Sequence, residues 1–488
     1  MNDNPDLQTT NRWSQPPEHK AKPSVTDQQS GTTNTSSAAI GEAGVDHLSL
    51  KVIWAYSVPM IAFGIMGMLF ATYLMKFATD ELLIAPAVMG TLLFMARLWD
   101  GISDPLTGFL SDRTRSRFGR RRSWMLAAAI PTGVGLWMMW SPPMTLSVPE
   151  LVIWMTCALL VYETASTMFL VPYGALGMEL TPNYHERTRL FGYRHMIGAI
   201  GTLLGLACLQ LMNMAEDKRE FAGQLSFFAS IFVAGLILWS ARVLPERSDF
   251  QGRVNKRMVS AFLDVVRNPH SRLLLIVYGV ETFGAASIGL MVPYIVEYVL
   301  PMQALMVPIL ITYIIPQFAF TPLWMTLARR YGKKQVWLSA MFISVFAFGG
   351  LFTVTEAGIM VWVWTFLAGF AGGCSAVVAP SIQADVIDYD EYLSGERKEG
   401  AYLSVWNLVR KSAASLTALA AGFALQFGGF EPGIEQSEET KVIMRGLLAL
   451  LPCVCYLIGG LLFMRFGFNE ADHARVRKAL AERAVSGA

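Results

Sequence analysis

The stretch ARLWDGISDPLTGFLSDRTRSRFGRRR (residues 96–122) decides the fold. It begins in an apolar run, carries charged side chains inside that run, and ends in a segment that holds six arginines. About 20 apolar residues are needed to cross the hydrocarbon layer of a bilayer, and Arg-rich loops mark the cytoplasmic side of membrane proteins. The stretch therefore predicts a membrane-spanning helix that is followed by a cytoplasmic loop.

The composition of the 488-residue chain supports a membrane protein. Hydrophobic residues make up 53% of it and charged residues 16%, whereas soluble domains average about 25% charged residues. The formal net charge of +2 excludes the strongly basic surface of a nucleic-acid-binding protein, so nucleic acid is not an expected partner. The five cysteines lie in apolar runs, at spacings that fit neither a disulfide framework nor a zinc site.

Twelve apolar stretches follow a polar N-terminal segment. Residues 1–47 are rich in Asn, Gln, Ser, Thr and Pro, and we expect them to form a disordered cytoplasmic tail. The first six predicted helices are 51–78, 84–111, 123–142, 149–178, 190–214 and 223–244. The second six are 272–299, 303–328, 334–354, 358–388, 401–427 and 440–466. These ranges predict an all-α membrane protein with six-helix bundles over 48–244 and 272–466, a central cytoplasmic loop over 245–271 and a cytoplasmic tail over 467–488.

Basic residues alternate between the loops. Loops 112–122, 245–271 and 328–334 and the tail from Arg465 are rich in Lys and Arg. The intervening loops are poor in them, with the exception of the pair Lys218 and Arg219. The positive-inside rule and the even number of helices therefore place both termini in the cytoplasm, and we expect an integral protein of the cytoplasmic (inner) membrane.

The two sets of six helices share an internal repeat. The segment RFGRRRSW (residues 117–124) recurs as RYGKKQVW (residues 330–337), each time after the second helix of its set. Two similar six-helix halves are typical of transporters whose substrate site lies at the bilayer midplane between the halves. Two unrelated cytoplasmic anchors are the alternative, which the shared glycine and tryptophan disfavour.

Three ionisable residues of the second predicted helix share one face. Arg97, Asp100 and Asp104 follow one another at steps of three and four residues, and Ser103 lies beside them. Charged groups inside a span are costly, so each is a functional candidate. Two carboxylates and a hydroxyl provide oxygen ligands for a small cation or, if burial raises a carboxyl pKa, a proton site. A purely structural pair of Arg97 and Asp100 is the alternative.

Other polar residues also lie within predicted spans. Lys411 is too deep in the eleventh helix to reach the membrane surface easily, so it requires a carboxylate partner or an anionic substrate. A structural role is as plausible as a functional one for Glu163 and Glu281, and more plausible for His195. The remaining candidates are Thr167, Arg194, Asn407 and Arg410, together with Tyr173, whose ring is of the kind that stacks on a sugar.

Three segments resemble one known family. GFLSDRTRSRFGRRR is similar to the loop signature of the major facilitator superfamily. The full stretch 96–122 resembles the second helix and following loop of the glycoside–pentoside–hexuronide:cation symporters, the melibiose-permease-like family. VPYGALGMELTPNYHERTRLFGYR (171–194) and ADVIDYDEYLSGERKEGAYLSVWNLVRK (384–411) resemble two further segments of that family. The resemblance covers about residues 50–466 and implies the twelve-helix major facilitator fold.

The resemblance also implies roles for individual residues. Asp100, Ser103, Asp104 and Thr167 match the cation-binding positions, with Asp100 and Asp104 holding Na⁺ if the carrier is sodium-coupled. Arg194 matches a charged residue of the sugar site, and Lys411 matches a lysine near both the carboxylates and the sugar. We assign Glu163, Tyr173 and Asn407 to the same substrate and coupling region.

Three family sugar contacts are replaced in this chain. They fall on Gly64, Leu170 and Gly174, which removes polar groups on which sugar selectivity depends. We therefore expect a symporter that couples Na⁺ or H⁺ influx to uptake of a glycoside, oligosaccharide or uronide. A cation-coupled carrier of lysolipids is the first alternative, and a transport-inactive receptor or scaffold the second. We expect a monomer without a cofactor, in contact with the bilayer and a small-molecule substrate, and no enzyme.

Overall fold

The computed structural model describes residues 47–181, 183–246, 265–395, 399–468 and 470–486, and within these ranges every regular element is helical. The N-terminal helices, here called the N-half, are α1 (Leu50–Ser57), α2 (Pro59–Thr72), α3 (Leu74–Asp80), α4 (Pro86–Arg113), α5 (Arg120–Trp140), α6 (Val148–Glu179), α7 (Tyr184–Met214) and α8 (Lys218–Val243). The C-terminal helices, here called the C-half, are α10 (Pro269–Tyr294), η2 (Ile295–Val299), η3 (Gln303–Leu305), α11 (Met306–Ala319), α12 (Thr321–Tyr331), α13 (Lys333–Phe352), α14 (Ile359–Ser394), α15 (Glu399–Phe427), α16 (Glu438–Arg445), η4 (Gly446–Leu450) and α17 (Leu451–Phe463). A last helix, α18 (Glu470–Ser486), follows them.

Single helices, or consecutive helices that join, form stretches that have the length and composition of membrane spans. Among the described residues there are nine such stretches, and the pair α11 and α12, which is bent by 44° at Phe320, makes a tenth. Helix α4 also has the length of a span but contains Arg97, Asp100 and Asp104, and α5 begins with three arginines. The predicted twelve-helix pattern thus appears helix by helix. The predicted tail 1–47, except its last residue, and residues 247–264 of the predicted loop lie outside the described residues.

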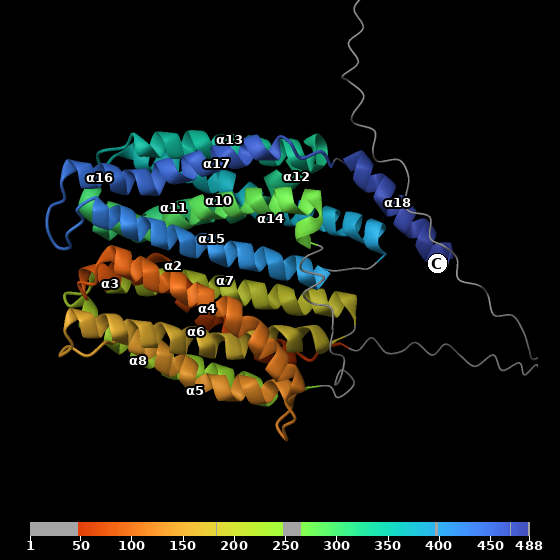
Figure 1. Ribbon diagram of the computed structural model, residues 1–488, viewed down its shortest axis with the longest axis horizontal. Coiled ribbons are helices and arrows are strands. Elements are labelled where there is room, and N and C mark those ends of the chain that lie inside the picture. Colours follow the sequence, from red (N-terminus) through yellow and green to blue (C-terminus); the bar gives the residue numbers. More distant parts are fainter. Residues whose placement is uncertain (1–46, 182, 247–264, 396–398, 469, 487–488) are drawn as a thin grey trace, which may run out of the picture.

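The helices form two adjoining bundles. Figure 1 shows α2–α8 in the lower bundle and α10–α17 in the upper one, with α4 and α15 near the boundary between them. Helices α4 and α15 pack closely along that boundary. A Cβ atom on Gly90 would lie 2.6 Å from the carbonyl oxygen of Ala418, and one on Gly422 would lie 2.4 Å from that of Pro86. Glycine is therefore required where these two helices cross.

The repeated loop segment has the same backbone conformation in both halves. Gly119 and Gly332 precede α5 and α13 with φ of 100° and 87°, a region that favours glycine. In the N-half, Arg121 pairs with Asp112 and Glu179. This side of the bundles, where α4 ends and α5 begins, is called the basic end below, and the opposite side, where α3 ends and α4 begins, the far end.

The predicted C-terminal tail contains a helix that the hydropathy pattern does not reveal. Helix α18 packs against α14. Its His473 lies 3.1 Å from a carboxylate oxygen of Asp388 and 3.6 Å from one of Asp385. Asp385 also accepts from Lys333 at 2.6 Å, so α18 is attached to the basic end of the C-half.

Candidate functional site

A cluster of charged side chains occupies the boundary between the halves. Arg97, Asp100 and Asp104 project from one face of α4, as their spacing predicts. Asp100 is only 2% exposed. Pro105 follows inside the helix and donates no hydrogen bond to the turn before it, which leaves a backbone carbonyl at the level of the two carboxylates.

Lys411 joins this cluster from the other half. Its ammonium group donates to Asp100 Oδ2 at 3.2 Å and to Asp104 Oδ2 at 3.1 Å. The side chains of Lys411 and Asp104 are 33% and 36% exposed. One cation of α15 thus bridges both carboxylates of α4 and connects the two halves at this point.

Helix α6 supplies the third side of the cluster. Arg97 Nη1 donates to Asp100 Oδ2 at 2.8 Å and to Glu163 Oε2 at 3.2 Å. The Thr167 hydroxyl donates to Asp104 Oδ1 at 2.8 Å. Glu163 and Thr167 are one turn apart on α6, so both reach α4 from the same direction. Asp100, Asp104, Glu163, Thr167 and Lys411, which the sequence predicts as site residues, are therefore brought together.

Three buried oxygen atoms in this cluster have no hydrogen-bond partner among the described residues: Asp100 Oδ1, Ser103 Oγ and Glu163 Oε1. Glu163 Oε1 still lies 3.1 Å from Arg97 Nη1, which leaves Asp100 Oδ1 and Ser103 Oγ, and both of these residues are buried. A buried polar atom without a partner is costly. When ionised, Asp100, Asp104 and Glu163 carry three negative charges, whereas Arg97 and Lys411 carry two positive ones. The cluster thus offers oxygen atoms to one additional monovalent cation.

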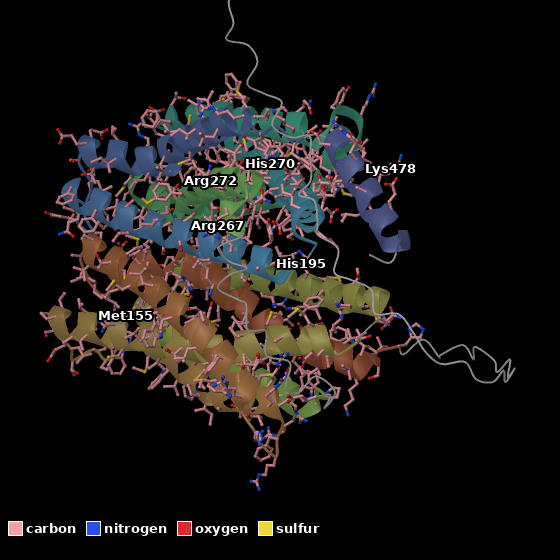
Figure 2. The ribbon with its side chains drawn as sticks, turned by 45° about the vertical axis from the view of Figure 1, so that its right-hand side comes forward. Met155, His195, Arg267, His270, Arg272 and Lys478 are labelled. Carbon is pink, nitrogen blue, oxygen red and sulfur yellow. The ribbon has the colours of Figure 1, made fainter. Side chains whose placement is uncertain are left out.

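The other predicted substrate residues lie apart from this cluster or show no contact with it. Tyr173 is fully buried, stacks on Tyr56 with ring centroids 4.4 Å apart, and donates a hydrogen bond to the backbone oxygen of Tyr56. The guanidinium carbon of Arg194 lies 5.3 Å from the centre of the Tyr173 ring. Asn407 is exposed, one turn from Lys411 on α15. Exposed His195 lies on α7 where the lower bundle borders the upper one (Figure 2).

The three replaced sugar positions differ in their surroundings. A Cβ atom on Gly64 would lie 2.4 Å from the carbonyl oxygen of Gly198, so Gly64 serves close packing of α2 on α7. A Cβ atom on Gly174 would meet no atom within 4 Å. Leu170 is partly buried in the apolar core. The position of Gly64 has no room for a side chain, whereas that of Gly174 opens into free space.

A second charged cluster, which the sequence reasoning missed, joins the halves at the far end. Lys76 is 2% exposed; its ammonium group pairs with Asp80 and lies 2.8 Å from Glu297 Oε2, across the boundary. Tyr298 donates to Asp80 at 2.8 Å. Lys218 is 3.8 Å from Glu297. The signal available in the sequence was Lys76, which lies deep inside the first apolar run.

Glu281 lies inside the C-half, away from both clusters. It accepts a hydrogen bond from the Ser375 hydroxyl at 3.2 Å, and Trp337 donates to Ser375 at 2.9 Å. Gly459 of α17 faces its side chain. Three helices therefore enclose Glu281, and among the described residues it forms no ion pair.

Comparisons with known proteins agree with the fold. The chain is 27% identical over 452 residues to a putative sulfoquinovose importer of Salmonella typhimurium, covering 90% of this chain and 94% of the relative. It is 25% identical over 471 residues to the sodium-dependent lysophosphatidylcholine symporter 1 of Mus musculus, covering 87% of each. The crystal structure of a D-xylose-proton symporter superposes with a TM-score of 0.63 at 15% identity, covering 86% of this chain and 98% of that one, which shows the major facilitator fold.

The model of one family matches nearly the whole membrane region. Its match spans residues 55–470, which includes both charged clusters and both copies of the repeated loop segment. The resemblance of the three motifs is thus confirmed, and the chain belongs to the MFS/sugar transport protein family.

Proposed function

We propose that this protein is a cation-coupled symporter whose coupling ion binds at Asp100, Ser103, Asp104 and Thr167. The observation that carries the proposal is the pair of unpartnered buried oxygens, Asp100 Oδ1 and Ser103 Oγ, beside two carboxylates. Sodium is favoured over the proton, because a proton needs one carboxylate whereas these positions offer several oxygen atoms to a metal ion. The ion is cargo that moves with the substrate.

Lys411 is the element that couples ion and substrate in this mechanism. In this structure its ammonium group pairs with both Asp100 and Asp104. A bound cation takes over that role and frees Lys411 to contact the substrate from α15. Each ligand thereby favours binding of the other, and such coupling is reciprocal. The two halves then rock about the site, so that it opens alternately to each side.

The arrangement of contacts supports a state that is closed at the far end. The Lys76 cluster and the close packing of α4 on α15 join the halves there. Leu403 and Leu408, on α15 toward the basic end, are exposed. We assign the basic end to the cytoplasm of an inner-membrane protein from its arginines and lysines, with both termini on that side. The proposed state is therefore inward-open, and we propose that it acts as a monomer.

The substrate is proposed to be a glycoside, oligosaccharide or uronide. Exposed Asn407 and partly exposed Lys411 supply polar groups beside the cation cluster, and the sulfoquinovose importer is a relative. A lysolipid is the second candidate. Two observations favour it: the open space at Gly174, and the likeness to a lysophosphatidylcholine symporter.

The direct test separates the coupling ion from the identity of the substrate. Purified protein is titrated with ²²Na⁺ by equilibrium dialysis, and proteoliposomes are assayed for uptake of melibiose, glucuronate and lysophosphatidylcholine. Uptake is driven by a sodium gradient or, in sodium-free buffer, by a pH gradient. We expect saturable sodium binding that Asp100→Asn and Asp104→Asn abolish and that Glu356→Gln, an exposed carboxylate of the same chain, leaves unchanged. Unaltered sodium binding or full uptake by Asp104→Asn would refute the proposal.

A further inference from the structure

A large apolar cavity lies inside the N-half, away from the charged clusters. Its volume is about 240 Å³, and it is lined by side chains of α2, α5, α7 and α8. Met66, Leu136, Trp140 and Met212 are among its walls, and Ser226 supplies a hydroxyl. An unfilled cavity destabilises a protein in proportion to its volume, and apolar cavities exclude water while accepting apolar ligands. A hydrocarbon is the chemically matched occupant.

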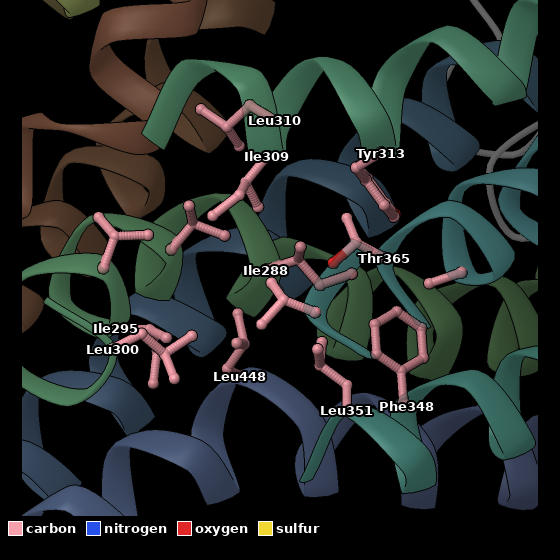
Figure 3. Close-up of a pocket in the computed structure, with 14 residues that line it drawn as sticks. Ile288, Ile295, Leu300, Ile309, Leu310, Tyr313, Phe348, Leu351, Thr365 and Leu448 are labelled. Carbon is pink, nitrogen blue, oxygen red and sulfur yellow. The ribbon is translucent and has the colours of Figure 1, made fainter. Parts of the chain in front are cut away.

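The C-half contains a much smaller cavity in a different place. Its volume is about 30 Å³, and it is lined mostly by side chains of α10, η2, α11, α13 and α14. Figure 3 shows Ile309 and Tyr313 of α11 and Phe348 and Leu351 of α13 around it. The cavity of the N-half is therefore the larger of the two.

The cavity reaches the outer surface of the bundle. Helices α5 and α8 lie on the side of the lower bundle that is farthest from the upper one (Figure 1). Phe228 and Phe232 of α8 line the cavity and are also exposed, and Cys208 of α7 is partly exposed. Phe228 and Phe232 thus connect the cavity wall to the outer surface of α8, on the side of the N-half that is far from the C-half.

A basic side chain stands at the far end of this cavity. Arg219 is one turn before Ala222, which lines it, and donates to the backbone oxygens of Pro142 and Pro143 at 3.3 and 3.0 Å, just beyond Trp140. Its buried Nε has no partner among the described residues. Guanidinium groups bind phosphate well. Arg219 is also one of the two basic residues that depart from the positive-inside pattern.

We propose that the N-half binds one membrane phospholipid, with an acyl chain in the cavity between α2, α5, α7 and α8 and the phosphate at Arg219. The lipid enters beside α8 from the leaflet at the far end. This site is separate from the cation cluster and from the substrate path between the halves. The lipid stabilises the N-half because it fills the cavity that the protein's own side chains leave.

The test compares lipid retention and thermal stability of the full chain in maltoside detergent. The probe is phosphatidylethanolamine with palmitoyl and oleoyl chains, counted by native mass spectrometry. We expect one retained lipid per chain and a rise in Tm on its addition, because a ligand that binds the folded state stabilises it. The double variant Ala222→Leu/Ala229→Leu, which fills the cavity, should lose at least fivefold of the retained lipid while its Tm without lipid is at least that of the native chain. Arg219→Gln should weaken retention without that gain in Tm.

Two matched controls keep the test falsifiable. Ala127→Leu adds the same side chain at an exposed position of α5, and Arg445→Gln removes a guanidinium at the far end of the C-half. Both should retain lipid as the native chain does. Equal retention in the filled double variant, or equal loss in Ala127→Leu, would overturn the proposal. Displacement by lysophosphatidylcholine but no binding of the two-chain lipid would also overturn it and would identify the cavity as a site for a lysolipid.

Discussion

We expect Lys76→Met to shift the protein from the state that is closed at the far end toward a state that is open there. Lys76→Met removes the cation that lies between Asp80 and Glu297. Breaking a buried ion pair costs about 3–5 kcal/mol, and we take the lower limit because the Glu297 side chain is 21% exposed and Lys218 lies 3.8 Å from it. Once the far end opens, water solvates the carboxylates of Asp80 and Glu297. Loss of Lys76 therefore destabilises the closed state and leaves the free energy of the open state nearly unchanged. A shift of about 3 kcal/mol is about 150-fold in the equilibrium between the two states.

Double electron–electron resonance measures this shift directly. Spin labels at Leu83→Cys and Ile434→Cys report the far end of each half, since both residues are well exposed, at 59% and 53%, and Ile434 follows Gly433, whose amide donates to Tyr298. The five native cysteines are replaced first, because Cys157 is exposed. We expect a short distance in the native chain and a second, longer distance that dominates in Lys76→Met.

Two further variants test whether loss of the ion pair across the boundary causes the longer distance in Lys76→Met. Lys76→Met/Glu297→Gln should regain part of the short distance, because it also removes the acid that the single variant leaves unpaired. Lys441→Met should leave the distances unchanged, since Lys441 pairs only with Glu435 and Glu438 of its own half among the described residues. Identical distance distributions for the native chain and Lys76→Met would refute the reasoning.

Three other substitutions test separate parts of the structure. Ser103→Ala should raise the sodium concentration that gives half-maximal binding by about tenfold, because it removes one contact that is about as strong as a hydrogen bond to a charged group. An unchanged titration would exclude Ser103 as a ligand. Gly64→Ala should lower Tm by an amount equivalent to about 1–3 kcal/mol, because its Cβ would lie 2.4 Å from a backbone oxygen of α7, whereas Gly67→Ala, with no atom within 4 Å, should not. Glu281→Gln should keep uptake within about twofold of native, because a glutamine oxygen still accepts from Ser375; loss of uptake would assign Glu281 to coupling.

Hydropathy and helix periodicity were sufficient to locate the helices. The predicted range 149–178 corresponds to α6 at Val148–Glu179, for example. The largest errors concern α14, which ends at Ser394 and not at 388, and α7, which begins at Tyr184 and not at 190. The first turns of α7 carry Glu186, Arg187 and Arg189. Hydropathy predicts only the apolar part of a helix, so it leaves out charged turns that extend beyond the membrane span.

The site itself was only partly visible in the sequence. The spacing of Asp100 and Asp104 gave their shared face, but no local pattern connects them to Lys411, more than 300 residues away; that expectation came from the family resemblance. The Lys76 cluster was missed because Asp80 and Glu81 were interpreted as part of a polar loop, and Glu297, the partner of Lys76 across the boundary, belongs to another apolar run. Gly64 was interpreted as the loss of a sugar contact, whereas in the structure it allows α2 and α7 to pack closely. The sequence does not reveal this role, because it depends on the neighbouring helix.

The two lysines that cross the boundary have different consequences for coupling. Lys76 reaches from the N-half to Glu297, and Lys411 from the C-half to Asp100 and Asp104. Opening the far end hydrates the carboxylates around Lys76, so water alone replaces that contact. Asp100 stays buried within the N-half, beside Arg97 and Glu163, so only a cation can replace Lys411 there without leaving a buried charge. Variants at Lys76 should therefore shift the balance of states yet keep uptake dependent on the cation. Lys411→Gln should instead bind sodium at least as tightly as the native chain, because no ammonium group competes for Asp100 and Asp104, but it should lose sodium-driven uptake. Native uptake by Lys411→Gln would show that coupling resides elsewhere.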